Sequence, residues 1–104
     1  MKKSIFLYTT VGNKKDANRI ANILLRKRLI ACANIFPIHS QYWWQGKIQH
    51  DKEFGIVLKT LSKKYQKIEP EIKRIHPYEC PCLVAFEIAR GYKPYLAWIE
   101  DSIK

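Results

Sequence analysis

Two consecutive tryptophans, Trp43 and Trp44, stand directly before a glycine-containing turn, and few small folds accommodate that arrangement. The residues on either side, about 31–44 and 47–60, read as two extended arms. Gly46 between them supplies the positive φ that a tight hairpin turn needs. The stretch therefore predicts a long β-hairpin with an aromatic tip.

The second arm has the alternation of a strand with one strongly apolar face, because Phe54, Ile56 and Leu58 occupy every second position. At roughly 3.3 Å per residue, an arm of about fourteen residues is about 45 Å long, whereas a compact domain of this size has a radius of gyration of about 13 Å. The hairpin must therefore bend or project. Pro37 cannot donate a ladder hydrogen bond, so it predicts a bulge or an edge position in the first arm.

A projecting tip with two tryptophans is an exposed apolar patch, and such patches usually mark interfaces. We therefore expect the tip to be buried against another copy of the chain. Trp43, Trp44 and Trp98 are interpreted as interface or core anchors rather than as platforms on which a ligand stacks.

The 104 residues are expected to form a single domain, 1–104, that buries about 60–70% of its unfolded surface. No apolar run approaches the ~20 residues that cross a bilayer, so membrane insertion is not expected. The first residues lead into a strand pattern without a signal-peptide core. The three cysteines lack the spacing of a disulfide framework, which is typical of a reducing compartment. Together these features predict a cytoplasmic protein.

The net charge of +10 raises the question of a polyanionic partner. Lysine, however, is scattered over all segments and forms no single stripe. We interpret the charge as a solvated basic surface, and nucleic acid is not expected as a partner.

Along the chain the pattern is strand, helix, strand, strand, helix, strand and a final helix. Strands are expected at Ile5–Thr9 and Leu83–Ile88 in addition to the hairpin, and the last helix is expected to begin near Pro94. Two helices on one face of a four-stranded antiparallel sheet form the βαββαβ ferredoxin-like plan, here with an extra C-terminal helix. The fold class is therefore α+β.

The helices carry recognisable boundary signals. Asn13 or Asp16 is available at the start of the first helix, and Ser62 is the expected N-cap of the second. Pro70 interrupts the second helical pattern and predicts a kink or a restart there. The apolar face nevertheless keeps its phase across Pro70.

Short motifs occur in a particular order along nearly the whole chain, and together they closely resemble the CutA family of divalent-cation tolerance proteins. The motifs are Tyr8-Thr9-Thr10, Arg28-Leu29-Ile30-Ala31-Cys32-Ala33-Asn34-Ile35, Tyr42-Trp43-Trp44 with Gly46-Lys47-Ile48, Leu58-Lys59-Thr60, His76-Pro77-Tyr78-Glu79 with Pro81, and Tyr95-Leu96-Ala97-Trp98-Ile99. The resemblance implies a ferredoxin-like subunit in a tight homotrimer resembling the PII signalling proteins. The long hairpins are then expected to contribute to sheets between subunits.

The resemblance also implies a role for divalent metal ions, and His76 and Cys32 are the candidate ligands. Pro77 is expected to move His76 out of the helix into a loop, and neutral imidazole is a common copper and zinc ligand. Cys32 is either a soft ligand or a buried inert thiol. Some family members have a cysteine at the position of Tyr8 and a second histidine at that of Ile75. Copper(II) generally takes three or four N, O or S donors, so the set is incomplete here.

Two further groups could bind metal. Cys80 and Cys82 are separated by one residue, which is tighter than the usual C-x2-C zinc spacing, and their side chains lie on the same side if the backbone is extended. They are either a metal-binding pair or two ordinary thiols. His39 and His50 are interpreted as isolated and solvent-facing.

Enzymatic chemistry is not predicted. The chain has no Ser/His/Asp set, no glycine-rich phosphate loop and no paired carboxylates at a defensible spacing. Asp51 and Glu53 are interpreted as ordinary charges on a sheet. No organic cofactor is expected.

We therefore predict a non-enzymatic, trimeric protein for tolerance of divalent cations such as copper. The alternative is a PII-like signalling or scaffold trimer whose inter-subunit clefts bind a small anion or a protein partner. Lys59 is then either a cation of such a cleft or a solvated strand-end lysine. The candidate interface or cleft residues are Trp43, Trp44, Lys59, Tyr78, Tyr95 and Trp98.

Overall fold

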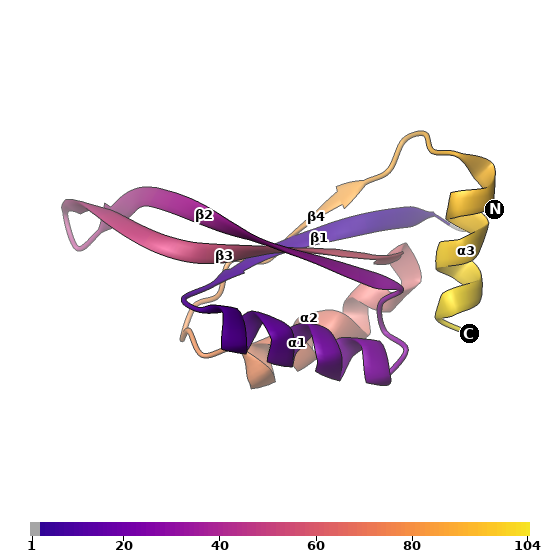
Figure 1. Cartoon of the computed structure of the whole chain (residues 1–104), viewed down its shortest axis with the longest axis horizontal. Coiled ribbons are helices and arrows are strands. Elements are labelled where there is room, and N and C mark those ends of the chain that lie inside the picture. Colours follow the sequence, from indigo (N-terminus) through magenta and orange to yellow (C-terminus); the bar gives the residue numbers. More distant parts are fainter. Residues whose placement is uncertain (1–2) are drawn as a thin grey trace.

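The computed structural model describes residues 3–104. The elements in order are β1 (Ser4–Val11), α1 (Lys14–Arg26), β2 (Cys32–Trp44), β3 (Lys47–Leu61), the 3-10 turn η1 (Ser62–Lys64), α2 (Tyr65–Ile75), β4 (Val84–Glu87) and α3 (Lys93–Ser102). This order of strands and long helices confirms the one predicted from the sequence (Figure 1).

The strands form one antiparallel sheet in the order β2-β3-β1-β4. Helices α1 and α2 lie on the same face of this sheet, and α3 lies at the end of the sheet opposite the hairpin tip (Figure 1). The structure therefore has the ferredoxin-like plan with an added C-terminal helix, as predicted.

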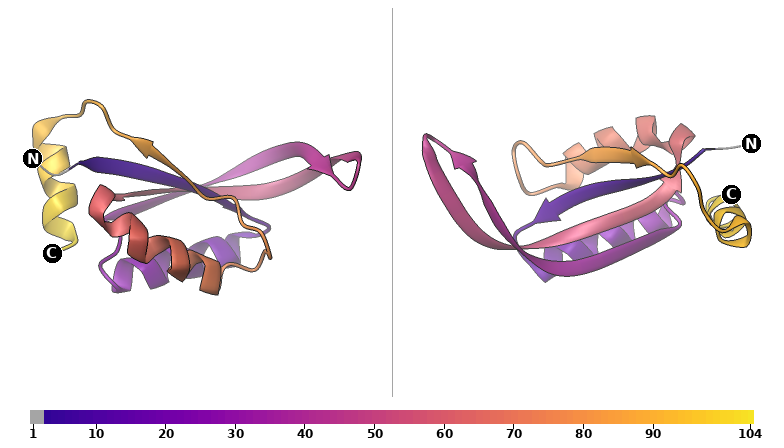
Figure 2. Two further views of the ribbon diagram at one scale, coloured as in Figure 1. Left: turned by 180° about the vertical axis from the view of Figure 1, so that it is seen from behind. Right: turned by 90° about the horizontal axis from the view of Figure 1, so that it is seen from above.

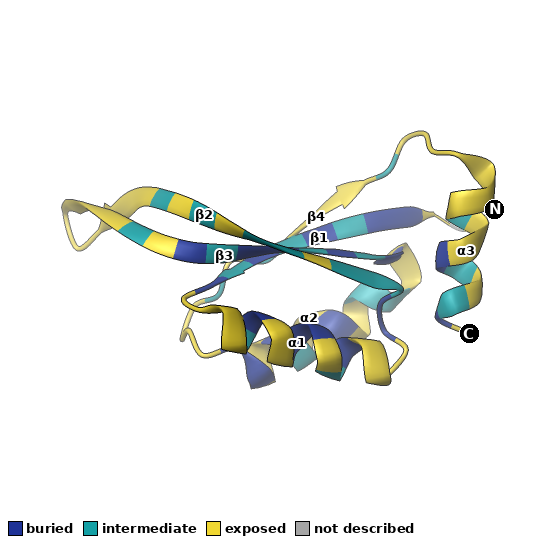
Figure 3. Ribbon diagram, in the orientation of Figure 1, coloured by how far each residue is buried: buried dark blue, intermediate teal, exposed yellow. Residues whose placement is uncertain are grey.

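The core lies between the sheet and its two helices. From Ile5 to Val11 in β1 and from Ile56 to Thr60 in β3, every second residue faces the helices and is buried (Figure 3). The core includes Leu7, Val11, Ile20, Leu24, Ile56, Leu58, Ile68 and Ile72. Burying a large aliphatic side chain contributes about 1.5–3 kcal/mol, so this layer stabilises the subunit. A smaller cluster of Leu61, Ile99 and Ile103 attaches α3 to the end of β3.

The start of α1 follows the sequence signal, whereas the start of α2 does not. Asn13 caps α1, because its side-chain oxygen accepts a hydrogen bond of 2.8 Å from the Asp16 N–H. Ser62, in contrast, is not the N-cap of α2. It opens η1 instead, and its carbonyl accepts from the N–H of Tyr65, so a 3-10 turn leads into the helix without a side-chain cap.

Pro70 lies inside α2, which runs without a break from Tyr65 to Ile75, so the predicted restart is wrong. Ile68 and Ile72 are both fully buried, and this packing on both sides of the proline holds the helix together although one backbone hydrogen bond is missing. The other outcome predicted at Pro70, a kink, stays a prediction.

The hairpin projects from the body. The β1–β3 ladder ends at the pair Val11↔Phe54, whereas the β2–β3 ladder continues to Trp44↔Lys47. Residues 38–53, called the arm below, therefore extend beyond the rest of the sheet (Figures 1 and 2). The subunit measures 45 × 26 × 22 Å as a result. Pro37 lies on the edge strand β2 in a ladder of constant register, so it marks an edge and not a bulge.

The turn of the hairpin consists of Gln45 and Gly46, with φ angles of 50° and 76°. Two successive residues with positive φ are the signature of the two-residue turn that matches the twist of the flanking strands. A Cβ at Gly46 would meet no atom within 4 Å, so glycine is favoured there by its backbone angle and not by lack of space.

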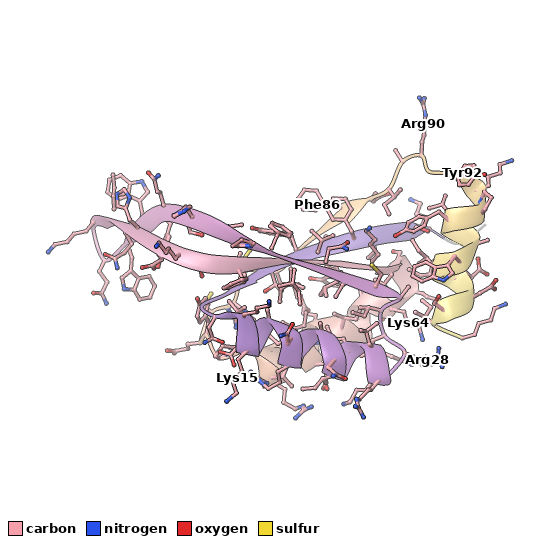
Figure 4. All side chains as sticks on the ribbon, viewed as in Figure 1. Lys15, Arg28, Lys64, Phe86, Arg90 and Tyr92 are labelled. Atoms are coloured by element: carbon pink, nitrogen blue, oxygen red, sulfur yellow. The ribbon has the colours of Figure 1, made fainter. Side chains whose placement is uncertain are left out.

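The sheet has a second surface, opposite α1 and α2, which we call the open face. Among the described residues, no helix covers its centre (Figures 1 and 2). Phe6 and Phe86 stack there with their ring centroids 4.9 Å apart, and the Phe86 side chain points away from the helices (Figure 4). Gly55 lets two more rings lie flat on this face, because a Cβ there would be 2.9 Å from the Phe36 ring and 3.2 Å from the Tyr8 ring.

Candidate functional site

The candidate site residues lie in three separate places. One group is at the base of the arm, the second is beside α3, and the third is the arm tip. The groups are His76 with Tyr78, then Cys32, Lys59, Tyr95 and Trp98, and finally Trp43 with Trp44.

His76 leaves α2 with φ −75° and ψ 136°, so it lies outside the helix, as expected for a residue before proline. Its ring is buried, and both nitrogens have partners. The backbone N–H of Tyr78 donates to Nδ1 at 3.0 Å, so Nδ1 carries no proton. Nε2–H then donates to the Thr10 carbonyl at 2.9 Å. Burial lowers the pKa of His76, so the imidazole is a neutral link between α2 and β1.

Tyr78 is linked to the base of the arm. Its hydroxyl donates to Glu53 Oε2 at 2.7 Å, and Glu53 is only 9% exposed. Burial, and after it this hydrogen bond and the Glu53 charge, raise the pKa of Tyr78 well above its ordinary value. The interpretation of Glu53 as an ordinary surface charge is therefore wrong. The sequence holds a signal for this position, because Glu53 alternates with Gly55 and Val57 and therefore lies on the same face of β3 as they do.

Asp51 also has a specific partner, because it accepts a hydrogen bond from the hydroxyl of Tyr42 in the arm. The two carboxylates of β3 thus each accept a hydrogen bond from a tyrosine hydroxyl. A hydrogen bond to an ionised acceptor is stronger than one between neutral groups, so each carboxylate fixes the position of its tyrosine. This arrangement makes the arm base and the loop after α2 one connected unit.

The group beside α3 combines a cation with two aromatic rings. Lys59 Nζ lies 5.4 Å from the centroid of the Tyr95 ring, and Tyr95 stacks on Trp98 with centroids 5.6 Å apart. A hydrogen bond with Tyr95 raises the pKa of Lys59. Cys32 lies opposite Lys59 in the β2–β3 ladder. The Lys59 ammonium is therefore held against an aromatic ring by a cation–π contact.

The structure does not bring His76 and Cys32 together. Cys32 pairs with Lys59, which in turn pairs with Phe6 of β1, whereas His76 contacts Thr10 of the same strand. Phe6 and Thr10 are four residues apart, which is about 13 Å along a strand, so the two candidate ligands are well separated. Across residues 3–104, no three His, Cys, Asp or Glu side chains are grouped so that they could hold a metal ion. The residues of one chain therefore do not fit a copper(II) centre at His76.

The remaining candidate ligands are exposed. Cys80 and Cys82 lie in the loop between α2 and β4 as free thiols. His39 and His50 both face solvent, as expected. They are not isolated from each other, because they line the same shallow hollow on the arm.

An antiparallel sheet with two helices on one face, a C-terminal helix at its end and a projecting hairpin defines a ferredoxin-like α+β domain with a long arm. A sequence profile of the CutA1 divalent ion tolerance protein matches residues 5–102. The chain belongs to this family.

Individual relatives agree with this assignment. The divalent-cation tolerance protein CutA of Archaeoglobus fulgidus is 44% identical over 99 residues, which are 95% of this chain and 97% of that protein. Its solved structure, described as periplasmic, superimposes with a TM-score of 0.94 over 97% of this chain and 99% of that one. The structure of CutA1 from Ehrlichia chaffeensis is 39% identical, with a TM-score of 0.95 over 100% and 98% of the two chains. No helix in the described part of the chain is long and apolar enough to span a membrane.

Proposed function

We propose that this protein is a non-enzymatic homotrimer that acts in the tolerance of divalent cations, copper among them, in the cytoplasm. The observation that carries the proposal is the apolar surface that the isolated subunit leaves uncovered. Trp43 and Trp44 are 73% and 59% exposed on the arm, and Phe86 is 48% exposed on the open face. A surface of this kind usually marks a protein interface.

The arm explains how copies of the chain would associate. Beyond Val11↔Phe54 the arm is a two-stranded ribbon, and both of its edges present unpaired backbone groups. A ribbon of this kind can add strands to the sheet of a neighbouring copy. Such a head-to-tail contact closes into a ring when the rotation between copies allows it. The family resemblance favours a ring of three.

The cation part of the proposal rests on the names of the relatives, which are called divalent-cation tolerance proteins. Copper is our narrower proposal. The free state of all three cysteines is consistent with a reducing compartment.

The test is native mass spectrometry of metal-stripped protein during a copper(II) titration. A trimer that takes up copper supports the proposal, whereas a monomer contradicts the assembly. Trp44→Ala should weaken assembly by roughly 30-fold or more, because buried tryptophans are common interface hot spots. Circular dichroism of the subunit should stay unchanged. Tyr92→Ala, at an exposed aromatic position far from the arm, is the matched control (Figure 4).

A second function, a PII-like signalling or scaffold trimer, is favoured by the Lys59, Tyr95 and Trp98 group. An anion in an inter-subunit cleft would be held by the Lys59 ammonium. This function predicts that phosphate raises the thermal stability of the wild type but not of Lys59→Gln. A copper(II) isotherm that is the same in wild type and His76→Ala would also favour it over a metal site at His76.

A further inference from the structure

The loop between α2 and β4 carries two exposed thiols separated by a single proline. Cys80 and Cys82 flank Pro81, and the loop that carries them lies at the end of the sheet nearest the arm (Figure 2). Consecutive Cα atoms are about 3.8 Å apart, so the Cα atoms of Cys80 and Cys82 lie at most about 7.6 Å apart. Both thiols are therefore within reach of one metal ion.

The loop leads directly into β4. Val84, the first residue of this strand, pairs with Tyr8 on the open face, and Cys82 lies two residues before it in the loop.

The loop is exposed but held at several points. Tyr78 donates to His76 through its N–H and to Glu53 through its hydroxyl. Lys73 donates to the carbonyl of Glu79, the residue directly before Cys80. A ligand pair on an anchored loop loses less conformational entropy when it binds than one on a free loop.

We propose that Cys80 and Cys82 form a two-thiolate site for a soft metal ion, Cu(I). Thiolates are the side chains that select Cu(I), and this ion accepts two ligands in a linear arrangement. The site needs no third protein donor, in contrast to copper(II) at His76.

Binding is a ligand exchange without a redox step. Two S–H bonds break, two S–Cu bonds form, the copper stays Cu(I), and two protons pass to solvent. Both proposed ligands belong to the same loop of one chain, so the site does not depend on the proposed trimer. A trimer without Cu(I) binding would overturn this inference and leave the assembly intact.

The test is an anaerobic titration of the reduced full-length protein with Cu(I) in competition with a chromogenic Cu(I) chelator. We expect one Cu(I) per chain, together with a thiolate-to-copper absorption band. The double variant Cys80→Ser/Cys82→Ser should bind at least 100-fold more weakly, since even groups behind a ligand are worth about 10–100-fold. The matched control, Cys32→Ser, should bind as the wild type does.

Two results would overturn the inference. One is an unchanged Cu(I) affinity in the double variant, and the other is a loss of binding in Cys32→Ser that equals that of the double variant. Because Cys80 and Cys82 are exposed, their replacement should leave the circular dichroism spectrum and the oligomeric state unchanged.

Discussion

The two faces of the sheet use the same strands in different ways. On the helix-covered face, side chains such as Leu7 and Leu58 are completely buried within one chain. On the open face, their immediate neighbours remain partly exposed, and the arm continues this unfinished surface to Trp44 (Figure 3). One face therefore stabilises the subunit, whereas the other is available for association. Strand alternation thus gives one stretch of the chain two surfaces, one closed by the helices and one still partly exposed.

The largest effect should come from changing adjacent residues of β3 that point to opposite faces. Leu58→Ala should lower the free energy of unfolding by about 2–5 kcal/mol, because it leaves a cavity in a closed core. Val57→Ala, on the half-buried open face, should cost less than about 1 kcal/mol in dilute protein. Urea denaturation at several protein concentrations measures both. If the open face is an interface, only the loss caused by Val57→Ala grows with protein concentration. A Val57→Ala loss that is the same at every concentration would contradict an interface on the open face.

An intermediate effect is expected at His76, where the core and the arm base meet. His76→Ala should cost about 1–3 kcal/mol, because the Thr10 carbonyl and the Tyr78 N–H lose their partner. The folded state lowers the pKa of His76 below 6.5, so the unfolded chain binds more protons in this range. The stability contribution is thus complete above pH 6.5 and is lost as the pH falls toward the lower folded pKa.

Denaturation between pH 5 and 8 tests this linkage. His76→Ala should remove the pH-dependent slope that His76 contributes, whereas His50→Gln, at an exposed arm position, should retain it. Retention of the full slope in His76→Ala would show that another group is responsible.

The smallest effect concerns two buried threonines of the helix-covered face. Thr60 donates its hydroxyl to the Leu29 carbonyl at 2.7 Å, whereas the Thr9 hydroxyl finds no partner among the described residues. Thr9→Val should therefore stabilise the protein by about 1 kcal/mol, and Thr60→Val should destabilise it by a similar amount. Thermal melts under identical conditions measure both shifts. Shifts of the same sign would contradict the assignment of these hydroxyls.

Features that depend on neighbouring residues were predictable from the sequence. The alternation through Phe54, Ile56 and Leu58 indicated the buried face of β3, and Gly46 indicated the turn. The order of the elements and the ordered motifs led to the fold class and to the family. Ser62 was misassigned because the chain has two ways to begin a helix, a side-chain cap or a 3-10 turn, and only the backbone path distinguishes them.

The strands, the helices, the projecting arm and the closely spaced cysteines could be read from the amino-acid sequence, because they follow from residue period, backbone angles and spacing along the chain. Which side chains meet depends instead on the three-dimensional fold. His76 contacts Thr10, which is 66 residues away, and Tyr78 contacts Glu53, which is 25 residues away. These contacts arise from the register and order of the strands, and they convert an expected metal ligand into a structural link. Local pattern carries no information on such pairings, because the entropy of loop closure and the packing of the whole sheet decide them together.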